Sequence, residues 1–411
     1  MSESSSSPAT RVQSAAPFPA PAYERQDATF REAFEILRDA IAKRAFPAAS
    51  IAVTSYRKVV ALKAFGRFTY EPDSPQVTTA SIFDLASVSK SVATTSMAMI
   101  LYQRGLLDLE VPVASIVPEF AAAGLSGADP RRREVTLHSL LAHSSGLPAY
   151  EKLFLKVKTK AELLAAAFAT PLTADPGKRA AYSDIGFIIL GVALERIADE
   201  TLDHFCQREL FGPLGMAHTA YNPPASWRDS IPPTADDRSF RNRIIQGEVQ
   251  DENASVLGGV AGHAGLFATA EDLATFAHVL IQAGRTSGGP ASLHSDIFRH
   301  EILRLETLAL FTRRESSPPG TSRALGWDTP SSPSQSGKYF SAGSFGHLGY
   351  TGTSLWIDPQ RQLSITLLTN RTWPDCANEA IKQVRPRFHD AVIAALEAAA
   401  NQENNKDEKW V

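Results

Sequence analysis

Ser87 and Lys90 are three positions apart at the start of a segment that contains no glycine or proline until Gly105. This composition predicts a helix that begins near Ser87 and is closed by a C-terminal glycine. Residues at positions i and i+3 lie on one face of a helix. A serine hydroxyl becomes nucleophilic when a neighbour takes its proton, and a lysine whose pKa is lowered by burial can do this. The free N–H groups at the helix start would suit an oxyanion.

The spacing alone is not specific, because the chain contains a second match at Ser55 and Lys58. That match lies between two β-rich runs, where we predict a solvated hairpin turn. Ser87 differs because it ends an apolar extended run and opens a long helix. We therefore take Ser87 and Lys90 as the candidate pair.

Tyr182 and Asp184 lie at the start of another predicted helix, whose apolar face carries Ile185, Ile188 and Ile189. A tyrosine beside a lysine can act as a general base or protonate a leaving group. A structural role is the alternative, with Tyr182 half-buried and Asp184 as the helix N-cap. Both readings can hold at once.

The segment from Gly346 to Gly352 precedes the last predicted hairpin. Gly349 would let a substrate approach the strand closely. The backbone N–H of Tyr350 would be a second oxyanion donor, and His347 would be a hydrogen-bond donor or a charge near the substrate. Lone histidines are usually structural, and we predict this for His143 and His263.

The elements that must position these residues are β-rich at the two ends of the chain and helical in the middle. The fold class predicted is α+β, an α/β sandwich in which one antiparallel sheet, built from both termini, is flanked by helices and carries an inserted, mostly helical domain. The predicted elements are a helix over 30–45, hairpins over 49–65 and 353–368, and a final helix around Phe388 and Val392.

The corresponding domain prediction is discontinuous. Residues 28–86 and 251–401 form the sheet domain, and 87–250 form the inserted helical domain. Residues 1–27 and 402–411 are predicted as disordered tails.

Three further local patterns predict a helix start, two surface loops and a core residue. Thr269 to Asp272 resembles a capping box at a helix start. Residues 284–293 and 314–338 are rich in Gly, Ser and Pro and are predicted surface loops. Cys206 is predicted to be a small core residue.

Composition limits the partners. The chain has 411 residues, 44% hydrophobic residues, 21% charged residues and a net charge of -3, which gives no electrostatic reason to expect nucleic acid or acidic membranes. The two cysteines lack metal-type spacing, and no apolar stretch reaches membrane-span length. No signal peptide is legible, so we expect a cytoplasmic protein, or a periplasmic one if this N-terminus is not native. The sequence indicates no particular oligomeric state.

Taken in order, three motifs resemble the superfamily of class C β-lactamases, D-alanyl-D-alanine carboxypeptidases and penicillin-binding proteins. That family has Ser-x-x-Lys, then Tyr-x-Asn, then Lys-Thr-Gly or His-x-Gly; this chain has Ser87-Val88-Ser89-Lys90, Tyr182-Ser183-Asp184 and His347-Leu348-Gly349. Blocks at 83–87, 140–148 and 262–267 also look like the same family. The last block lies in a segment, 251–272, that is similar to the β-lactamase-related serine hydrolase branch of the family.

The resemblance implies a mechanism. Ser87 would attack a carbonyl, Lys90 and Tyr182 would share the proton handling, and the N–H groups of Ser87 and Tyr350 would hold the oxyanion. Water would then clear the acyl-enzyme, with no metal or organic cofactor. The implied substrate is a small molecule or a short peptide with an ester, amide or lactam bond.

Two departures from the family pattern bear on the substrate. Asp184 stands where the β-lactamases have the Asn that contacts the substrate amide, and His347 stands where they have a Lys that helps to hold a carboxylate. A neutral imidazole is a weaker anion anchor than an ammonium group. We therefore expect esterase or D-amino-acid peptidase activity rather than efficient β-lactam hydrolysis.

Two other readings stay open at this point. The first is a penicillin-binding sensor or ligand-holding module that is acylated without turnover; Lys90 and Tyr182 beside Ser87 favour turnover. The second is an α/β-hydrolase, which needs Gly-x-Ser-x-Gly at a strand-to-helix turn. The nearest match, Gly352 to Trp356, lacks the second glycine and continues as strand.

Overall fold

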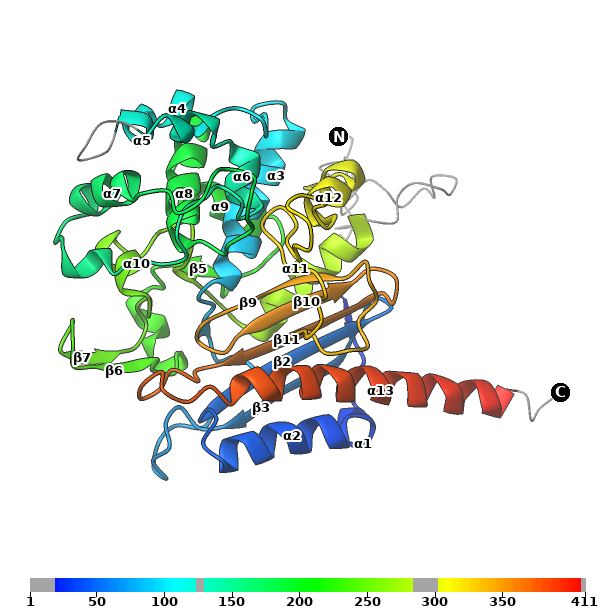
Figure 1. Ribbon diagram of the computed structural model, residues 1–411. Coiled ribbons are helices and arrows are strands. Elements are labelled where there is room, and N and C mark those ends of the chain that lie inside the picture. The colour runs from blue at the N-terminus through cyan, green and yellow to red at the C-terminus, as the bar shows by residue number, and fades with distance from the viewer. Residues whose placement is uncertain (1–18, 123–128, 284–301, 408–411) are drawn as a thin grey trace, which may run out of the picture.

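The computed structural model describes residues 19–122, 129–283 and 302–407. In these residues a β-sheet lies between two layers of helices, and a mostly helical part lies beside it (Figure 1). The predicted α+β fold, with a sheet built from both ends of the chain, is confirmed.

The main sheet has six strands in the order β1-β3-β2-β11-β10-β9. Neighbouring strands are antiparallel except for the β1–β3 pair. The β2–β3 and β10–β11 pairs are the two predicted hairpins. The strands are β1 (Ala20–Pro21), β2 (Ala48–Ser55), β3 (Lys58–Gly66), β9 (Phe345–Leu348), β10 (Ser354–Asp358) and β11 (Leu363–Thr369).

Successive side chains of a strand point to opposite faces of the sheet, so the strands contribute to two different hydrophobic cores. Ile51 and Val53 of β2 face the core under α2 (Arg31–Ala42) and α13 (Ile381–Asp407), which come from opposite ends of the chain. The short helix α1 (Gln26–Thr29) precedes α2. Ala52 of β2 faces the larger core with α11 (Ala270–Ala283). The helices of both chain ends therefore cover one face of the sheet, and α11 covers the other (Figure 1).

The helical part surrounds the buried α8. It is built from η1 (Lys90–Thr95), α3 (Ser96–Gln103), α4 (Val113–Ile116), α5 (Pro118–Ala122), η2 (Pro130–Glu134), α6 (Leu137–Leu141), η3 (Leu153–Leu155), α7 (Lys160–Ala169), α8 (Asp184–Ala198), α9 (Leu202–Cys206) and η4 (Gln207–Phe211). It shares the larger hydrophobic core with the sheet.

Small strands and helices connect the two parts. A three-stranded sheet joins β4 (Phe83–Asp84), β8 (Leu266–Ala268) and β5 (Ala220–Tyr221), and a separate hairpin joins β6 (Ala235–Asp237) and β7 (Arg243–Ile245). The remaining helices are η5 (Ala225–Ser230), α10 (Glu252–Val256) and α12 (Leu305–Thr312). Helix α10 packs against α7 and η3.

The helix predicted from Ser87 to Arg104 is present, but it begins after Ser87. Ser87 lies in the turn before it, a π-helical segment follows over Lys90–Thr95, and Gly105 ends it with a φ of 72°. All six residues of the π-helical segment are buried. The side chains of Ser91 and Thr94 donate hydrogen bonds to backbone carbonyls elsewhere in the chain, which ties this segment into the core.

Two local predictions need correction. The loop over 314–338 is not simply a surface loop, because Leu325 and Trp327 are fully buried and Gly326 donates its N–H to Leu141. At the start of α11, Thr269 caps the N–H of Asp272, but the Asp272 carboxylate turns away to the 218–219 segment, so only half of a capping box forms. Residues 284–293 lie outside the described residues.

The ends of the chain are partly ordered. Residues 19–27 contribute β1 and the start of α1, and α13 continues to Asp407, into the segment predicted as a C-terminal tail. Residues 1–18 and 408–411 lie outside the described part. The division into a sheet domain and an inserted helical domain stays a prediction.

Candidate active site

Ser87 follows a strained turn at the end of β4. Ala86 has a φ of 46°, a conformation that residues with a side chain rarely adopt. The Asp84 carboxylate accepts the Ala86 N–H at 2.8 Å, which helps to hold this turn. Ser87 is partly exposed, whereas the residues on both sides of it are buried. The turn therefore presents one hydroxyl at the edge of a packed core.

Lys90 is fully buried, and its Nζ has three polar neighbours. It lies 2.9 Å from Ser87 Oγ, 2.8 Å from the carbonyl oxygen of His263 and 2.6 Å from Asp184 Oδ1. Burial lowers the pKa of Lys90, and the charge of Asp184 opposes that shift. The predicted Ser–Lys pair is thus within proton-transfer distance.

Tyr182 reaches the same hydroxyl from the segment before α8. Its phenol donates to Ser87 Oγ at 2.7 Å. Burial, followed by the negative charge of Asp184, raises the pKa of Tyr182 well above its usual value, so the phenol is neutral at neutral pH. The His143 ring lies 4.7 Å from the Tyr182 ring, and His143 Nδ1 accepts the Ser183 N–H. His143 therefore supports the tyrosine structurally, as predicted.

Asp184 is the first residue of α8 rather than its N-cap. Ser183 fills that position and accepts the Gly186 N–H at 3.0 Å. The structural alternative for Asp184 is therefore wrong, because a neighbouring serine already caps the helix. The Asp184 carboxylate points instead at Lys90, with 16% of its side chain exposed.

His347 lies on β9 and is buried, with its ring centroid 6.0 Å from that of Tyr182. Its Nδ1 is 2.8 Å from the carbonyl oxygen of Leu348. A carbonyl can only accept, so Nδ1 carries the proton and Nε2 is left as an acceptor. Burial first, and then the charges of Lys90 and Arg323, lower the pKa of His347 to about 3. A neutral acceptor differs from the donor or charge that we predicted.

Gly349 is packed tightly against neighbouring residues of the protein. A Cβ atom there would meet Thr353 Oγ1 and the carbonyl oxygen of Leu85 within 3.0 Å. Close packing inside the protein therefore requires a glycine here, and the approach of a substrate at Gly349 stays a prediction.

Tyr350 lies in the turn that follows β9, and this turn is tied to the Ser87 turn. The Thr353 hydroxyl donates to Leu85 at 2.9 Å, and the Thr351 hydroxyl donates to the Asp84 carbonyl at 2.8 Å. Arg371 donates to the Tyr350 carbonyl at 2.7 Å. The two threonine bonds tie the turn that contains Tyr350 to the segment that immediately precedes Ser87.

Arg323 is a site residue that sequence reasoning missed. Its guanidinium lies 5.3 Å from the centre of the Tyr182 ring, and its charge helps to lower the pKa values of Lys90, His143 and His347. It comes from the loop over 314–338, in which no motif marks it. The nearby apolar Leu325 and Trp327 were the available signal that this loop turns inward.

Asp251 and His263 form a supporting pair behind Lys90. The His263 ring lies 2.9 Å from Asp251 Oδ1, and Asp251 also accepts the Ala254 N–H at the start of α10. The backbone carbonyl of His263 accepts a hydrogen bond from Lys90, while its side chain pairs with Asp251. His263 is therefore structural, as predicted.

The two competing serine sites do not have this arrangement. Ser354 lies within strand β10 and is fully buried, which removes the α/β-hydrolase reading. Tyr56 and Arg57, between Ser55 and Lys58, form the exposed turn of the β2–β3 hairpin. Both cysteines are free, and Cys206 is buried as predicted.

The described part of the chain has no helix of the length and apolarity that crossing a membrane requires. Nor do its His, Cys, Asp and Glu side chains gather into a group of three or more that would hold a metal ion. A groove of about 570 Å³ runs between α2 and α13, lined by charged residues such as Glu32, Asp39 and Arg387. It includes none of the predicted site residues.

Comparisons with known proteins identify a family and a shared fold. Residues 33–385 match the family described as Beta-lactamase. An N-acetylmuramyl-L-alanine amidase of Bacillus subtilis is 30% identical over 359 residues, which cover 79% of this chain and 77% of the relative. A putative D-alanyl-D-alanine carboxypeptidase of Salmonella agona is 30% identical over 373 residues, which cover 82% and 81%.

Solved structures share the fold at lower identity. EstCE1, described as a hydrolase with promiscuous acyltransferase activity, has a TM-score of 0.68 and 21% identity, with 89% of this chain and 99% of that chain covered. A class C beta lactamase has a TM-score of 0.68 and 15% identity over the same shares. An octameric penicillin-binding protein homologue from Pyrococcus abyssi has a TM-score of 0.63 and 20% identity, with 89% and 77% covered.

Proposed function

Because the chain belongs to the Beta-lactamase family, we propose that it is a serine hydrolase that forms an acyl-enzyme on Ser87 and cleaves an ester or an amide. One observation carries the proposal: Ser87 Oγ lies 2.9 Å from Lys90 Nζ and 2.7 Å from the Tyr182 phenol. A hydroxyl between an amine and a phenol has both a proton acceptor and a proton donor at hand.

Acylation begins with Lys90 in its neutral form. Ser87 Oγ bonds to the substrate carbonyl carbon, and its proton moves to Lys90 Nζ. The carbonyl oxygen becomes an oxyanion that accepts the N–H groups of Ser87 and Tyr350. The bond to the leaving group then breaks, and the leaving group takes the phenolic proton of Tyr182, which is restored from Lys90.

Deacylation repeats these steps with water. Water bonds to the acyl carbon and gives its proton to Lys90, the bond from that carbon to Ser87 Oγ breaks, and a proton returns to Ser87. The acid product leaves, and the starting state is restored. Asp184 contributes charge: it keeps the pKa of buried Lys90 from falling further and fixes the direction of its amine.

The charges around the hydroxyl support a substrate with an anionic end. Neutral His347 is a weak anchor for a carboxylate, but Arg323 supplies a guanidinium close to Tyr182. The relative named as a putative D-alanyl-D-alanine carboxypeptidase suggests D-amino-acid peptides, and the relative named as an amidase suggests an amide bond. We place such D-amino-acid peptides and simple esters ahead of β-lactams.

Turnover of a small substrate panel tests the proposal. The panel contains p-nitrophenyl acetate and butyrate, a D-alanyl-D-alanine peptide and nitrocefin, each tried with the native chain and with Ser87→Ala. We expect hydrolysis of at least one ester or peptide, slow nitrocefin cleavage and no activity above background for Ser87→Ala. Full activity of Ser87→Ala would overturn the proposal.

The same panel separates an enzyme from a sensor. A sensor would give one equivalent of released p-nitrophenol and then stop, with a stable mass increase on the protein. An enzyme releases product continuously. A permanent adduct with every substrate would replace the hydrolase proposal by the ligand-holding module.

A further inference from the structure

Asp84, at the end of β4, is buried and uses both carboxylate oxygens to hold backbone N–H groups. Oδ1 accepts the Ala86 N–H at 2.8 Å, and Oδ2 accepts the Gln250 N–H at 2.6 Å. Burial raises the pKa of Asp84 to about 6, so the group is ionised at neutral pH in spite of its surroundings. A buried carboxylate lowers the stability of the fold unless neighbouring groups compensate for the lost hydration.

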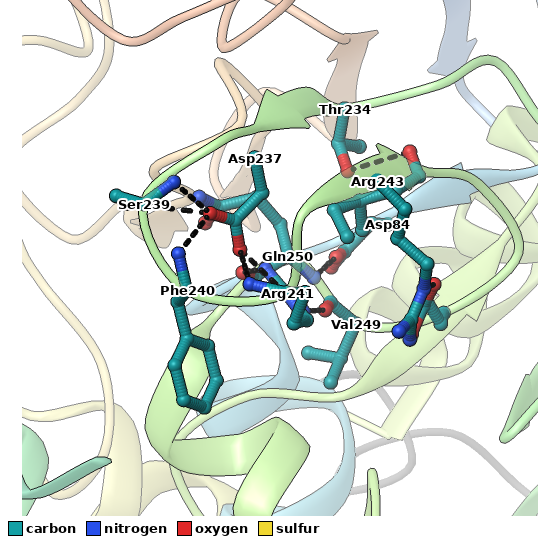
Figure 2. A network of polar contacts seen from close by, with 11 residues as sticks. Asp84, Thr234, Asp237, Ser239, Phe240, Arg241, Arg243, Val249 and Gln250 are labelled. Atoms are coloured by element: carbon teal, nitrogen blue, oxygen red, sulfur yellow. Dashed lines mark hydrogen bonds and ion pairs between the residues drawn. The ribbon is translucent and has the colours of Figure 1, made fainter. Parts of the chain in front are cut away.

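The compensating group is Arg241, which binds the backbone next to Gln250. Arg241 donates from Nη1 to the Val249 carbonyl and from Nη2 to the Gln250 carbonyl, both at 2.7 Å. The Val249 carbonyl and the Gln250 N–H are the two ends of one peptide group. That peptide therefore lies between the guanidinium of Arg241 and the carboxylate of Asp84, and each end strengthens the hydrogen bond at the other (Figure 2).

Arg241 is itself held in the loop between β6 and β7. Its Nε donates to Asp237 Oδ2 at 2.9 Å, and Asp237 also accepts the N–H groups of Ser239 and Phe240. Both side chains of the pair are 6% exposed. Only the planar fork of an arginine reaches a carboxylate and two carbonyls at once.

These contacts run from Arg241 through the 249–250 peptide and Asp84 to the turn before Ser87. Ala86 is held at a φ of 46°, and such strained residues persist only where the surroundings fix them. The Leu85–Ala86 peptide is held at both ends, since Thr353 donates to its carbonyl and Asp84 accepts its N–H. The direction in which Ser87 leaves the turn depends on this peptide.

We propose that Arg241 is a positioning residue for Ser87, acting through the 249–250 peptide and Asp84. The loop between β6 and β7 thereby becomes part of the catalytic apparatus, although none of its side chains touches the hydroxyl. This inference rests on the proposed function, in which Ser87 is the nucleophile.

The identity of residue 84 follows from the same arrangement. A carboxylate accepts at both oxygens, whereas an asparagine offers one acceptor and one NH₂ donor. Asp84→Asn would therefore lose either the Ala86 bond or the Gln250 bond. We expect it to resemble the loss of Arg241.

The experiment compares Arg241→Met, Asp84→Asn and their double variant with the native chain. The matched control is Arg243→Met, because Arg243 lies in the same hairpin but pairs on the surface with Glu248. The readouts are kcat and KM for the best p-nitrophenyl ester and the rate at which a fluorophosphonate labels Ser87. Thermal unfolding verifies that each variant is folded at the assay temperature.

We expect kcat and the labelling rate of Arg241→Met and Asp84→Asn to fall about 10- to 100-fold, which is the scale of a small misplacement of a reacting group. KM should change less than about 3-fold, because no substrate contact is lost. The double variant should lose no more than the worse single variant, because both act through one path. Arg243→Met should match the native chain.

Native labelling rates in both single variants would overturn the inference, and so would losses that multiply in the double variant. If Arg241→Met does not fold, Arg241→Lys replaces it: the lysine keeps the charge but cannot bind both carbonyls, so an intermediate loss of kcat is expected and native kcat contradicts the inference. Failure of the native chain to be labelled at Ser87 would instead overturn the proposed function.

Discussion

Lys90 is a buried amine whose pKa is set by two opposing effects. Burial lowers the pKa of Lys90, and the carboxylate of Asp184, 2.6 Å away, raises it. If Lys90 is the base, the acid limb of the kcat/KM profile reports the loss of its proton. Asp184→Asn removes the effect that raises the pKa, so the acid limb should move to lower pH.

The control for this prediction is Asp184→Glu, which keeps the negative charge and should leave the limb nearer its native position. The measurement is kcat/KM of the best ester from pH 5 to pH 10 for the three proteins. An acid limb that stays in place or moves to higher pH in Asp184→Asn would show that Lys90 is not the titrating base.

Arg323 offers a second prediction for a single residue. Its guanidinium lies 5.3 Å from the centre of the Tyr182 ring and makes a long ion pair, at 3.6 Å, with Asp328. Arg323→Gln should raise KM at least about 10-fold for a substrate that ends in a carboxylate, the scale of one lost charge-assisted contact, and should change a neutral ester little. Arg313→Gln, at an exposed arginine of the same region, is the control. Equal effects on both substrates would exclude an anchoring role.

At this scale the sequence predicted which residue types do the chemistry better than it predicted how they are supported. Ser87, Lys90 and Tyr182 carry motif signals and meet at one hydroxyl. Arg323 carries none, and the family-like block over 83–87 marked Asp84 without giving it a role. Both roles depend on contacts with residues far away along the chain. The acceptor role of His347 also depends on burial, which its motif does not encode.

The turn over 349–353 is the element that connects the sheet to the nucleophile. Arg385 donates to the carbonyls of Gly349 and Thr353, and Thr353 donates to Leu85. Gly349 is packed against this network with no room for a Cβ atom. The turn therefore transmits the position of β9 and β10 to the start of the catalytic helix.

Gly349→Ala should accordingly lower the free energy of unfolding by about 2 kcal/mol, because an overpacked core residue costs about 1–3 kcal/mol. It should also slow labelling of Ser87. Gly343→Ala is the matched control, because Gly343 is exposed and has nothing within 4 Å of its Cβ direction. Denaturant unfolding measures the stability of the two variants, and reaction with a fluorophosphonate measures their labelling rates. Equal stability of the two variants would contradict the tight packing described at Gly349.

Regular elements were predictable where a single period dominates. The hairpins β2–β3 and β10–β11 and the helices α2 and α13 follow from alternation or helical spacing of apolar residues. The loop over 314–338 was misread because glycine, serine and proline suggest exposure, whereas Leu325 and Trp327 fill the core. Composition describes a loop's backbone but not which of its side chains turn inward.

Across the whole molecule, buried histidines set the acid stability. Burial lowers the pKa of His347 and His389 to about 3 and that of His278 to about 4. The unfolded chain binds these protons near pH 6.5, so the stability that neutral histidines provide is present above pH 6.5 and is lost as the pH falls towards 4. Asp84 acts the other way: burial raises its pKa to about 6, so protonation below pH 6 stabilises the fold. Burial also lowers the pKa of His143 and raises the pKa values of Glu252 and Asp272. We expect the histidines to dominate, because the pKa shifts of His278, His347 and His389 are larger than the shift of Asp84.

We therefore expect the Tm to fall by about 5 °C between pH 7.5 and pH 5. His278→Gln cannot titrate and should reduce this fall, whereas His204→Gln, at an exposed histidine, should not. Differential scanning fluorimetry across the pH range measures this. A Tm that is flat or rises towards pH 5 would contradict the assignment of buried neutral histidines.

The predicted sheet built from both ends of the chain is the feature of the whole molecule that sequence reasoning reached most directly. Hairpins near the two ends can pair edge to edge into one sheet whose faces are covered by helices, and β2 does pair with β11. The path that joins the β6–β7 loop to Ser87 was out of reach, because it depends on one buried arginine that no pattern distinguishes from surface arginines.

The position of the covalent bond tests the central claim most directly. The native chain and Ser87→Ala would be incubated with a fluorophosphonate, digested and mapped by mass spectrometry. The mechanism described above predicts one adduct, located on Ser87 in the native chain and absent from Ser87→Ala. An adduct on any other residue, or undiminished labelling of Ser87→Ala, would contradict it.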